Sequence, residues 1–154
     1  MKVTILAVGK VKGPLTPAID EFTRRAARYW KMDMVELKEG TGDGREKVME
    51  EEGRGILERL DETSLVWALT RKGTGITSRG LASRLESLAV GGHPGINFVL
   101  GGAFGLSTEV LARSDRKLSL SPMTLPHDLA RLVLLEQLYR AGTIRRNEPY
   151  HKGS

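Results

Sequence analysis

Short apolar runs that alternate with longer amphipathic stretches constrain the fold of this chain most strongly. Leu65–Leu69 and Ile96–Leu100 are apolar at nearly every position, rather than at every second one. Strands that are covered on both faces of a sheet have this pattern. Between such runs, apolar residues recur with helical spacing, as at Leu81, Leu85 and Leu88. The alternation predicts an α/β fold, a mostly parallel sheet with flanking helices.

The same pattern predicts where each element lies. Strands are expected at Lys2–Val8, Asp33–Leu37, Leu65–Leu69, Ile96–Leu100 and Lys117–Leu120. Helices are expected at Pro14–Trp30, Arg45–Leu60, around Leu81–Leu88, at Leu106–Ala112 with Ser107 as N-cap, and at Leu129–Ala141. Loops are expected at Glu39–Gly44 and Lys72–Thr77. No repeat or linker interrupts the chain, so residues 1–154 are expected to form a single domain.

Ligands of open α/β sheets bind beyond the carboxyl ends of the strands. Three such ends are notable: Ala68–Thr70, Leu100–Gly105 and Leu120–His127. Gly101 and Gly102 suit either a tight turn or the close approach of a ligand to the backbone. Their spacing is not that of a dinucleotide-binding motif, and the chain has no Walker A sequence. A nicotinamide-binding domain and a P-loop NTPase are therefore not expected.

The charge of the chain favours a polyanionic partner without requiring one. The chain has 24 Lys and Arg residues and 19 Asp and Glu residues, which gives a net charge of +5. Positive charge attracts polyanions such as nucleic acids. The C-terminal segment concentrates positive charge and adds an aromatic and an imidazole, through Arg140, Arg145, Arg146, Tyr150, His151 and Lys152. Such side chains can meet phosphates and stack on bases. A basic enzyme without a nucleic-acid partner fits the composition equally well.

Several classes of site and location are not expected. The chain has no cysteine, so neither a disulfide framework nor a thiolate metal site is expected, and its three scattered histidines lack metal-ligand spacing. The apolar run at the N-terminus is too short for a signal peptide, and no run approaches the length of a membrane span. A soluble, cytoplasmic protein is expected.

The segment Leu129–Ala141 has an unusually apolar circumference. Its apolar residues are Leu129, Leu132, Val133, Leu134, Leu135 and Leu138. A helix that is apolar nearly all round is buried in a core or between subunits. We therefore expect this helix to form a homodimer interface. Glu136 and Arg140 are four residues apart and can form a plain helical ion pair. Alternatively, Arg140 lies near an RNA phosphate or across the interface.

Three stretches resemble one known family. They are Phe98–Leu106, the segment from Leu118 through Met123-Thr124-Leu125-Pro126-His127, and the ending from Leu135-Glu136-Gln137-Leu138-Tyr139-Arg140-Ala141 through Glu148-Pro149-Tyr150-His151-Lys152. Together with the opening Ile5–Lys10 and the chain length, they resemble the ribosomal RNA large subunit methyltransferase H (RlmH) family. The resemblance covers nearly the whole chain, and its last third carries the most specific motifs.

The resemblance implies a fold, a reaction and a partner. The family has the SPOUT fold, in which the C-terminal part forms a trefoil knot, and it forms homodimers through helices of the knot. It uses S-adenosylmethionine to methylate N3 of a pseudouridine in helix 69 of large-subunit (23S) rRNA, on assembled 70S ribosomes. The residues that correspond to its cofactor pocket are Leu69, Gly101, Gly102, Leu120, Ser121, Pro122, Met123, Thr124, Leu125 and Pro126. His127, Arg140, Tyr150 and His151 correspond to positions for substrate binding or catalysis.

The roles within this set stay open at the level of sequence. N3 of a pseudouridine must lose a proton, so His127 and His151 compete as the general base, with Tyr150 as a further catalytic candidate. An RNA-contacting or structural role suits either histidine equally well. We expect Arg140, Tyr150, His151 and Lys152 to contact RNA.

The chain departs from the family at two positions and admits two other functions. Asp128 stands where Gln is frequent, Asn147 stands where Gly is frequent, and Gly153-Ser154 extend past the usual ending. A basic RNA-binding factor without catalysis would explain the charge but not three cofactor-like loops. A methyltransferase of the same fold acting on tRNA is a further alternative, against which the lack of an appended RNA-binding domain argues. Binding of S-adenosylmethionine separates the first alternative from the enzyme.

Overall fold

A five-stranded parallel sheet organises the chain. The structure, a computed structural model, describes residues 1–152. The strands are β1 (Lys2–Val8), β2 (Lys31–Leu37), β3 (Leu65–Thr74), β4 (Gly95–Leu100) and β5 (Arg116–Leu118), and their order in the sheet is β2-β1-β4-β3-β5. Every pairing is parallel, so the predicted α/β class is confirmed. The trefoil knot stays a prediction.

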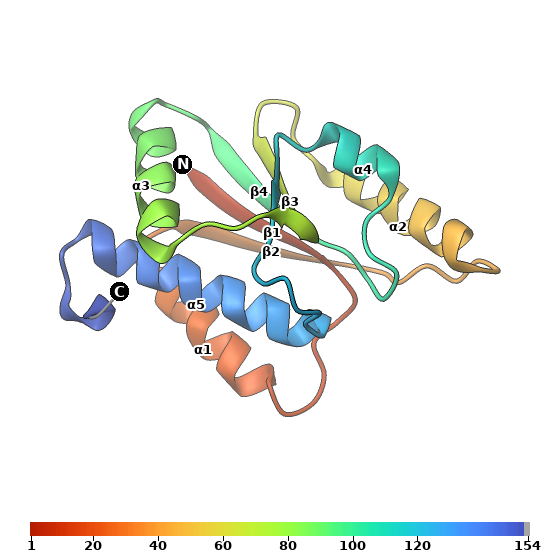
Figure 1. Cartoon of the computed structure of the whole chain (residues 1–154), viewed down its shortest axis with the longest axis horizontal. Coiled ribbons are helices and arrows are strands. Elements are labelled where there is room, and N and C mark those ends of the chain that lie inside the picture. The colour runs from red at the N-terminus through yellow and green to blue at the C-terminus, as the bar shows by residue number, and fades with distance from the viewer. Residues whose placement is uncertain (153–154) are drawn as a thin grey trace.

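Helices cover both faces of the sheet. They are α1 (Thr16–Ala26), α2 (Arg45–Arg59), α3 (Ser78–Val90), α4 (Thr108–Arg113), α5 (His127–Arg145) and the short 3₁₀ helix η1 (Pro149–His151). α5 packs against α1 and α3 on one face, while α2 and α4 pack together on the other (Figure 1). Within residues 1–152, no helix is both long enough and apolar enough to cross a membrane.

The two layers explain why the central strands are apolar throughout. Val3, Ile5 and Ala7 of β1 point into the core beneath α1, α3 and α5. Leu6 and Val8 point into a second core beneath α2 and α4. Both sets are at most 2% exposed, as the period of two along a strand requires when both faces are covered.

β3 is longer than predicted and takes up part of the expected loop Lys72–Thr77. After Leu69 pairs with Leu118, a bulge follows and Thr74 pairs with the same residue. Gly73 permits this, because a Cβ there would lie 2.7 Å from the carbonyl carbon of Lys117. Bulges next to a glycine bend a strand without ending it. Arg71 and Lys72 are consequently held on a strand rather than in a free loop.

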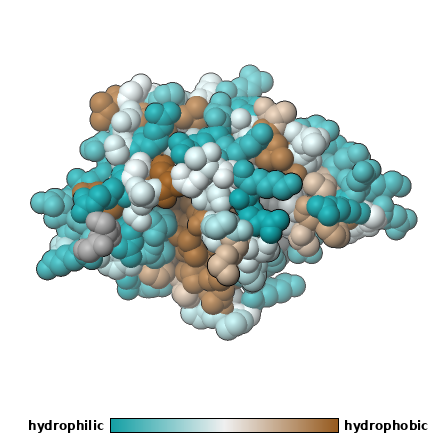
Figure 2. Space-filling model, viewed as in Figure 1, coloured by the Kyte–Doolittle hydropathy of each residue, from teal (hydrophilic) through white to brown (hydrophobic). Residues whose placement is uncertain are grey.

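The apolar circumference of α5 is partly accounted for by the chain's own core. Leu134, Leu135 and Leu138 are 0% exposed and pack against the helices beside them. Leu129 and Val133, one helical turn apart, remain half-buried and belong to neither core. The face seen in Figure 2 carries an apolar strip over the part occupied by α5 and α1, with hydrophilic side chains on both sides. The homodimer stays a prediction, and its interface would lie on Leu129 and Val133.

The end of α5 explains why the chain tolerates Asn147. This residue has a φ of +52°, and it is the only described non-glycine residue with a positive φ. The backbone N–H of Asn147 donates to Ile144, and that of Glu148 donates to Thr143, which is the hydrogen-bond pattern of a Schellman cap. Asparagine enters the left-handed region more readily than other non-glycine residues. The departure from the family's glycine therefore preserves the turn that leads into the tail.

Candidate functional site

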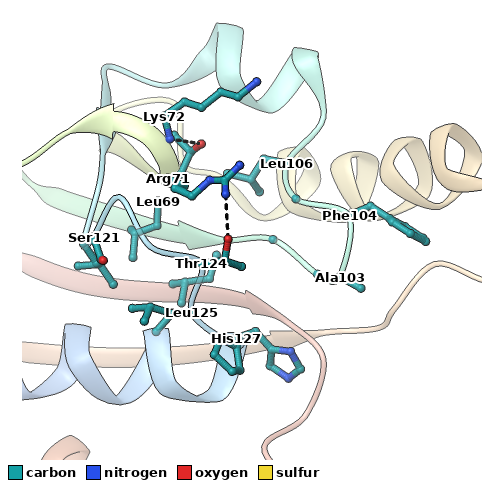
Figure 3. A pocket seen from close by; sticks show the side chains of 18 of the residues that line it. Leu69, Arg71, Lys72, Ala103, Phe104, Leu106, Ser121, Thr124, Leu125 and His127 are labelled. Atoms are coloured by element: carbon teal, nitrogen blue, oxygen red, sulfur yellow. Dashed lines mark hydrogen bonds between the residues drawn. The ribbon is translucent and has the colours of Figure 1, made fainter.

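A cavity of about 680 Å³ opens at the carboxyl ends of β3, β4 and β5, beside the first turn of α5 (Figure 3). Parallel strands bring these ends to one edge of the sheet, as the sequence pattern predicted. The residues that line it are Leu69–Lys72, Leu100–Leu106, Leu120, Ser121, Met123–His127 and Ala130. The lining contains every residue predicted for the cofactor pocket except Pro122.

Close packing explains the two glycines that follow β4. Neither Gly101 nor Gly102 has a positive φ, so backbone conformation does not require glycine there. A Cβ on Gly101 would lie 2.7 Å from the carbonyl carbon of Gly105, and one on Gly102 would lie 2.7 Å from Oε2 of Glu52. Gly105, with a φ of +86°, is the glycine that the turn needs for its conformation. The turn is thus tight, and it also forms a wall of the cavity.

The loop from Leu120 to Pro126 is shaped by its own hydrogen bonds. Ser119 donates from Oγ to the carbonyl of Ser121, and Oγ of Ser121 accepts from the backbone N–H of Met123. Arg71 donates from Nη1 to Oγ1 of Thr124 over 2.9 Å, which ties β3 to this loop across the cavity mouth (Figure 3). Met123 is 75% exposed, so its side chain is free to pack on a ligand.

His127 begins α5 at the edge of the cavity. Its Nε2 lies 2.9 Å from Oδ1 of Asp128, a contact that becomes an ion pair when the imidazole is protonated. The His127 side chain is 40% exposed. Asp128, the second departure from the family, therefore places a carboxylate next to the histidine that is nearest to the cavity.

The C-terminal tail folds back and packs on the second half of α5, from Glu136 onward. Tyr150 donates from its hydroxyl to Oε1 of Glu136 over 2.9 Å, and its ring lies 4.5 Å from that of Tyr139. Arg140 pairs with the same Glu136 over 2.6 Å, so the helical ion pair is the arrangement observed. Burial, and then the hydrogen bond to Glu136, raise the pKa of Tyr150.

A further contact anchors the tail to the end of α1. The hydroxyl of Tyr29 donates to Glu148. Burial and this hydrogen bond raise the pKa of Tyr29 to about 12. His151 is half-buried, and its Nδ1 has no hydrogen-bond partner within residues 1–152. Lys152 is exposed, while Gly153 and Ser154 lie outside the described residues.

The two groups of candidate residues are therefore far apart in one chain. α5 has 19 residues, which at 1.5 Å per residue span about 28 Å. His127 lies at its start, whereas Tyr150 follows its end and folds back only as far as Glu136, nine residues or about 14 Å from His127 along the helix. Within residues 1–152, no residue of the C-terminal tail lines the cavity.

Sequence reasoning missed several residues at the cavity. Arg71 and Lys72 line it, and Glu52 contacts its glycine turn from behind. The two cations follow a recognised strand end and could have been found by extending β3. Glu52 gave no signal, because it lies in a run of three glutamates that reads as a solvated helix face.

The cavity fits a nucleoside-containing ligand. Its volume is that of sites for drug-sized molecules, which are apolar with a few polar groups. Leu69, Leu120 and Leu125 supply apolar walls, and three loops supply backbone N–H and C=O groups. The tight glycine turn leaves its backbone uncovered by a side chain. Within residues 1–152, no cluster of histidine and acidic side chains is suited to a metal ion.

Comparison with known proteins identifies relatives over the full chain. The family model described as "predicted SPOUT methyltransferase" matches residues 1–151. Ribosomal RNA large subunit methyltransferase H of Clostridium beijerinckii is 44% identical, with 99% of this chain and all of that protein aligned. The protein of the same name from Syntrophotalea carbinolica is 46% identical, over 98% of this chain and 99% of that protein.

A solved structure shares the fold at low sequence identity. A probable methylase family protein from Haemophilus influenzae Rd KW20 superimposes with a TM-score of 0.57 at 16% identity. The alignment covers 98% of this chain and 70% of that one. At this identity, the likeness supports the fold and nothing finer.

Proposed function

The chain belongs to the SPOUT methyltransferase family, and from this premise we propose that it transfers a methyl group from S-adenosylmethionine to large-subunit ribosomal RNA. The observation that carries the proposal is the cavity at three strand ends, walled by the Gly101–Gly102 turn and the Leu120–Pro126 loop. The names of the full-length relatives support the choice of rRNA.

The finer proposal concerns the target. We propose N3 of a pseudouridine in helix 69 of 23S rRNA, presented by the assembled 70S ribosome in the cytoplasm. Bound S-adenosylmethionine supplies an electrophilic methyl on a sulfonium. In the transfer, the sulfur–methyl bond breaks with its electron pair returning to sulfur, a nitrogen–methyl bond forms, and the N3 proton passes to a base. Leu69, Leu120 and Leu125 exclude water and orient the reactants, which supplies much of the rate.

The separation of the candidate residues favours a site built from two chains. His127 lies at the cavity, whereas Tyr150 packs on Glu136, nine residues or about 14 Å along α5, and no tail residue within 1–152 lines the cavity. In a two-fold dimer, the same surfaces of both chains meet, so the end of one α5 can approach the start of the other. The half-buried Leu129 and Val133 would supply apolar contact for this arrangement. The tail of one subunit would then complete the cavity of its partner.

Within such a site, each candidate has a role that suits its chemistry. His127 or His151 accepts the N3 proton, since a histidine can do so near neutral pH. Tyr150 stacks on a base or orients it, and Arg140 and Lys152 meet phosphates. Tyr150 and Arg140 already share Glu136, so RNA binding would redistribute these contacts.

Two measurements test the proposal. Calorimetry should show S-adenosylmethionine binding to the protein alone, and a protein that binds rRNA but not this ligand would be a non-catalytic RNA-binding factor. Mass mapping of rRNA from a deletion strain should reveal one missing methyl group on the large subunit, restored by incubating its 70S ribosomes with the protein and S-adenosylmethionine. Methylation of tRNA instead would assign the enzyme to the other substrate class.

A further inference from the structure

Glu52 is a buried carboxylate directly behind the glycine turn of the cavity. It lies in the middle of α2 and is 5% exposed. Its Oε1 accepts from the backbone N–H of Gly40 over 3.3 Å, while Oε2 has no hydrogen-bond partner within residues 1–152. Buried polar atoms without a partner are rare in folded proteins. The position of this carboxylate therefore needs a reason.

The carboxylate touches the inner wall of the cavity. A Cβ built on Gly102 would lie 2.7 Å from Oε2 and 2.8 Å from Oε1 of Glu52. Gly102 itself lines the cavity. Only the thickness of the backbone therefore separates the carboxylate from a ligand at this turn.

No cation neutralises Glu52 within the described part of the chain. None of the ion pairs among residues 1–152 includes it. Burial raises the pKa of Glu52 most, the backbone N–H of Gly40 lowers it, and the carboxylate of Glu39 raises it again. The N–H of Gly102, which lies near the carboxylate without reaching hydrogen-bond geometry, lowers the pKa slightly, and Glu51 raises it slightly. A buried carboxylate among other carboxylates is costly, and a positive ligand nearby relieves that cost.

We propose that Glu52 is a positioning residue that supports the Gly101–Gly102 turn and presents a negative charge behind it, so that the cavity prefers cationic S-adenosylmethionine to its neutral product. The inference rests on the proposed function. The sulfur of S-adenosylmethionine carries a positive charge, whereas that of S-adenosylhomocysteine is a neutral thioether. The two ligands are otherwise alike, so the attraction to Glu52 falls mainly on the first. Methyl transfer then weakens the binding of its own product.

The test compares both ligands on Glu52→Gln by calorimetry. Glutamine has the same size and can still accept from Gly40, so the variant should fold, which circular dichroism checks. The Kd of S-adenosylmethionine should rise about tenfold, and that of S-adenosylhomocysteine should stay within about twofold. Sinefungin, which carries an amine near the position of the sulfonium, should weaken as S-adenosylmethionine does. Glu51→Gln is the matched control, because it removes the same charge one residue away and should leave both affinities unchanged.

Equal weakening of both ligands by Glu52→Gln would overturn the inference, because it would mean that Glu52 only shapes the turn. Unchanged binding of both would overturn it as well. If Glu52→Gln does not fold, Glu52→Asp decides, since it keeps the charge and should keep most of the preference for the cationic ligand, whereas an equal affinity for both ligands contradicts it. A wild-type protein that binds neither ligand would contradict the proposed function itself. A wild-type protein that binds both ligands without preference would contradict only the inference about Glu52.

Discussion

Gly102 has no room for a side chain, because a Cβ there would lie 2.7 Å from Oε2 of Glu52, which is too close for two atoms that are not bonded. Gly102→Val should push the turn into the cavity or displace Glu52, and we expect S-adenosylmethionine binding to fall below detection by calorimetry. The fold should survive, because the far end of a side chain rather than a strand or helix backbone is displaced.

A glycine on the same helix as Glu52 provides the control for this substitution. A Cβ on Gly55 would meet nothing within 4 Å, so Gly55→Ala should keep full ligand affinity. Alanine should also stabilise α2 by about 0.5–1 kcal/mol. Unchanged affinity of Gly102→Val would remove this turn from the ligand site.

Arg131 joins the start of α5 to the ends of β1 and β2. It is 2% exposed, donates to Oε2 of Glu36 over 2.8 Å and donates to the carbonyl of Gly9 over 3.0 Å. Arg131→Met should lower the free energy of unfolding at pH 7 by about 2 kcal/mol. This is less than the loss expected for a fully buried ion pair, because the Glu36 side chain is about one-third exposed and solvent weakens the interaction. Urea denaturation measures the difference.

The loss should depend on pH in a defined direction. The hydrogen bond from Arg131 lowers the pKa of Glu36 in the folded chain. The pair therefore contributes stability above the ordinary pKa of a glutamate, and that contribution disappears as the pH falls through the lowered value. Wild type and Arg131→Met should thus converge in acid. A constant difference down to pH 3 would show that Arg131 acts through its packing and its hydrogen bond to Gly9, and not through Glu36.

Some single residues could not be assigned from sequence, for a physical reason. Glu52 is chemically identical to Glu50 and Glu51 beside it, and only the packing of α2 on the glycine turn buries it. Arg131 lies in an otherwise apolar segment, and its partners are 95 and 122 residues away. By contrast, Ser107 was predicted as an N-cap and does accept from the N–H of Val110, because a cap is a local interaction.

At the level of elements, α5 has one face in the core and another that is incompletely covered. Leu134 and Leu138 are buried in the chain itself, so charge at either position would unfold the protein and would not probe a dimer. Leu129→Asp with Val133→Asp should give a folded monomer by light scattering. Val90→Asp, at a residue 82% exposed on α3, should remain a dimer. A dimeric and active double variant would place the interface elsewhere.

The C-terminal tail gives a separate prediction. Truncation after Glu148 keeps the contact of Glu148 with Tyr29 and the cap of α5, so the fold, the dimer and the affinity for S-adenosylmethionine should be preserved. Methylation should fall by roughly 10²-fold or more, the scale of a positioned proton-transfer group. His151→Ala should lower kcat if His151 is the base, and should raise KM for ribosomes if it only contacts RNA. Full activity of the truncated enzyme would leave His127 as the base.

The limits of the elements show how far the sequence pattern reaches. β1 was predicted with its observed bounds, because its apolar residues end at Gly9. β3 was predicted too short, since Arg71 and Lys72 are polar and only pairing with β5 continues the strand. α5 extends past Ala141 to Arg145, where cations are favourable at a helix end, and the Schellman cap then stops it. Local patterns predicted the elements and the end of β1, whereas pairing with the distant β5 determined the end of β3.

The arrangement of the complete protein links the cavity, the tail and the proposed dimer. The monomer carries a charge of +5, so a dimer would carry twice that and would attract RNA without selecting a sequence. Selection of the target nucleotide would then come from the shape of the site. In the proposed dimer, this site consists of the cavity of one chain and the tail of the other. The strand ends that form the cavity were predictable from sequence because a parallel sheet aligns them. The distance between His127 and His151 was not predictable from the sequence, because it depends on the tail folding back on its own helix.

A site shared between two subunits makes inactive variants complementary. His127→Ala and the truncation after Glu148 damage opposite ends of the chain, so each homodimer should have two defective sites. In a mixed dimer, one cavity receives an intact His127 from one chain and an intact tail from the other, while the second cavity lacks both. Random mixing makes half of the dimers mixed, so about one quarter of the wild-type activity should return. The variants should be mixed after mild denaturation and renaturation, with methyl transfer to 70S ribosomes as the readout. A mixture no more active than its two components would mean that each chain completes its own site, which is not the arrangement within residues 1–152, where no tail residue lines the cavity.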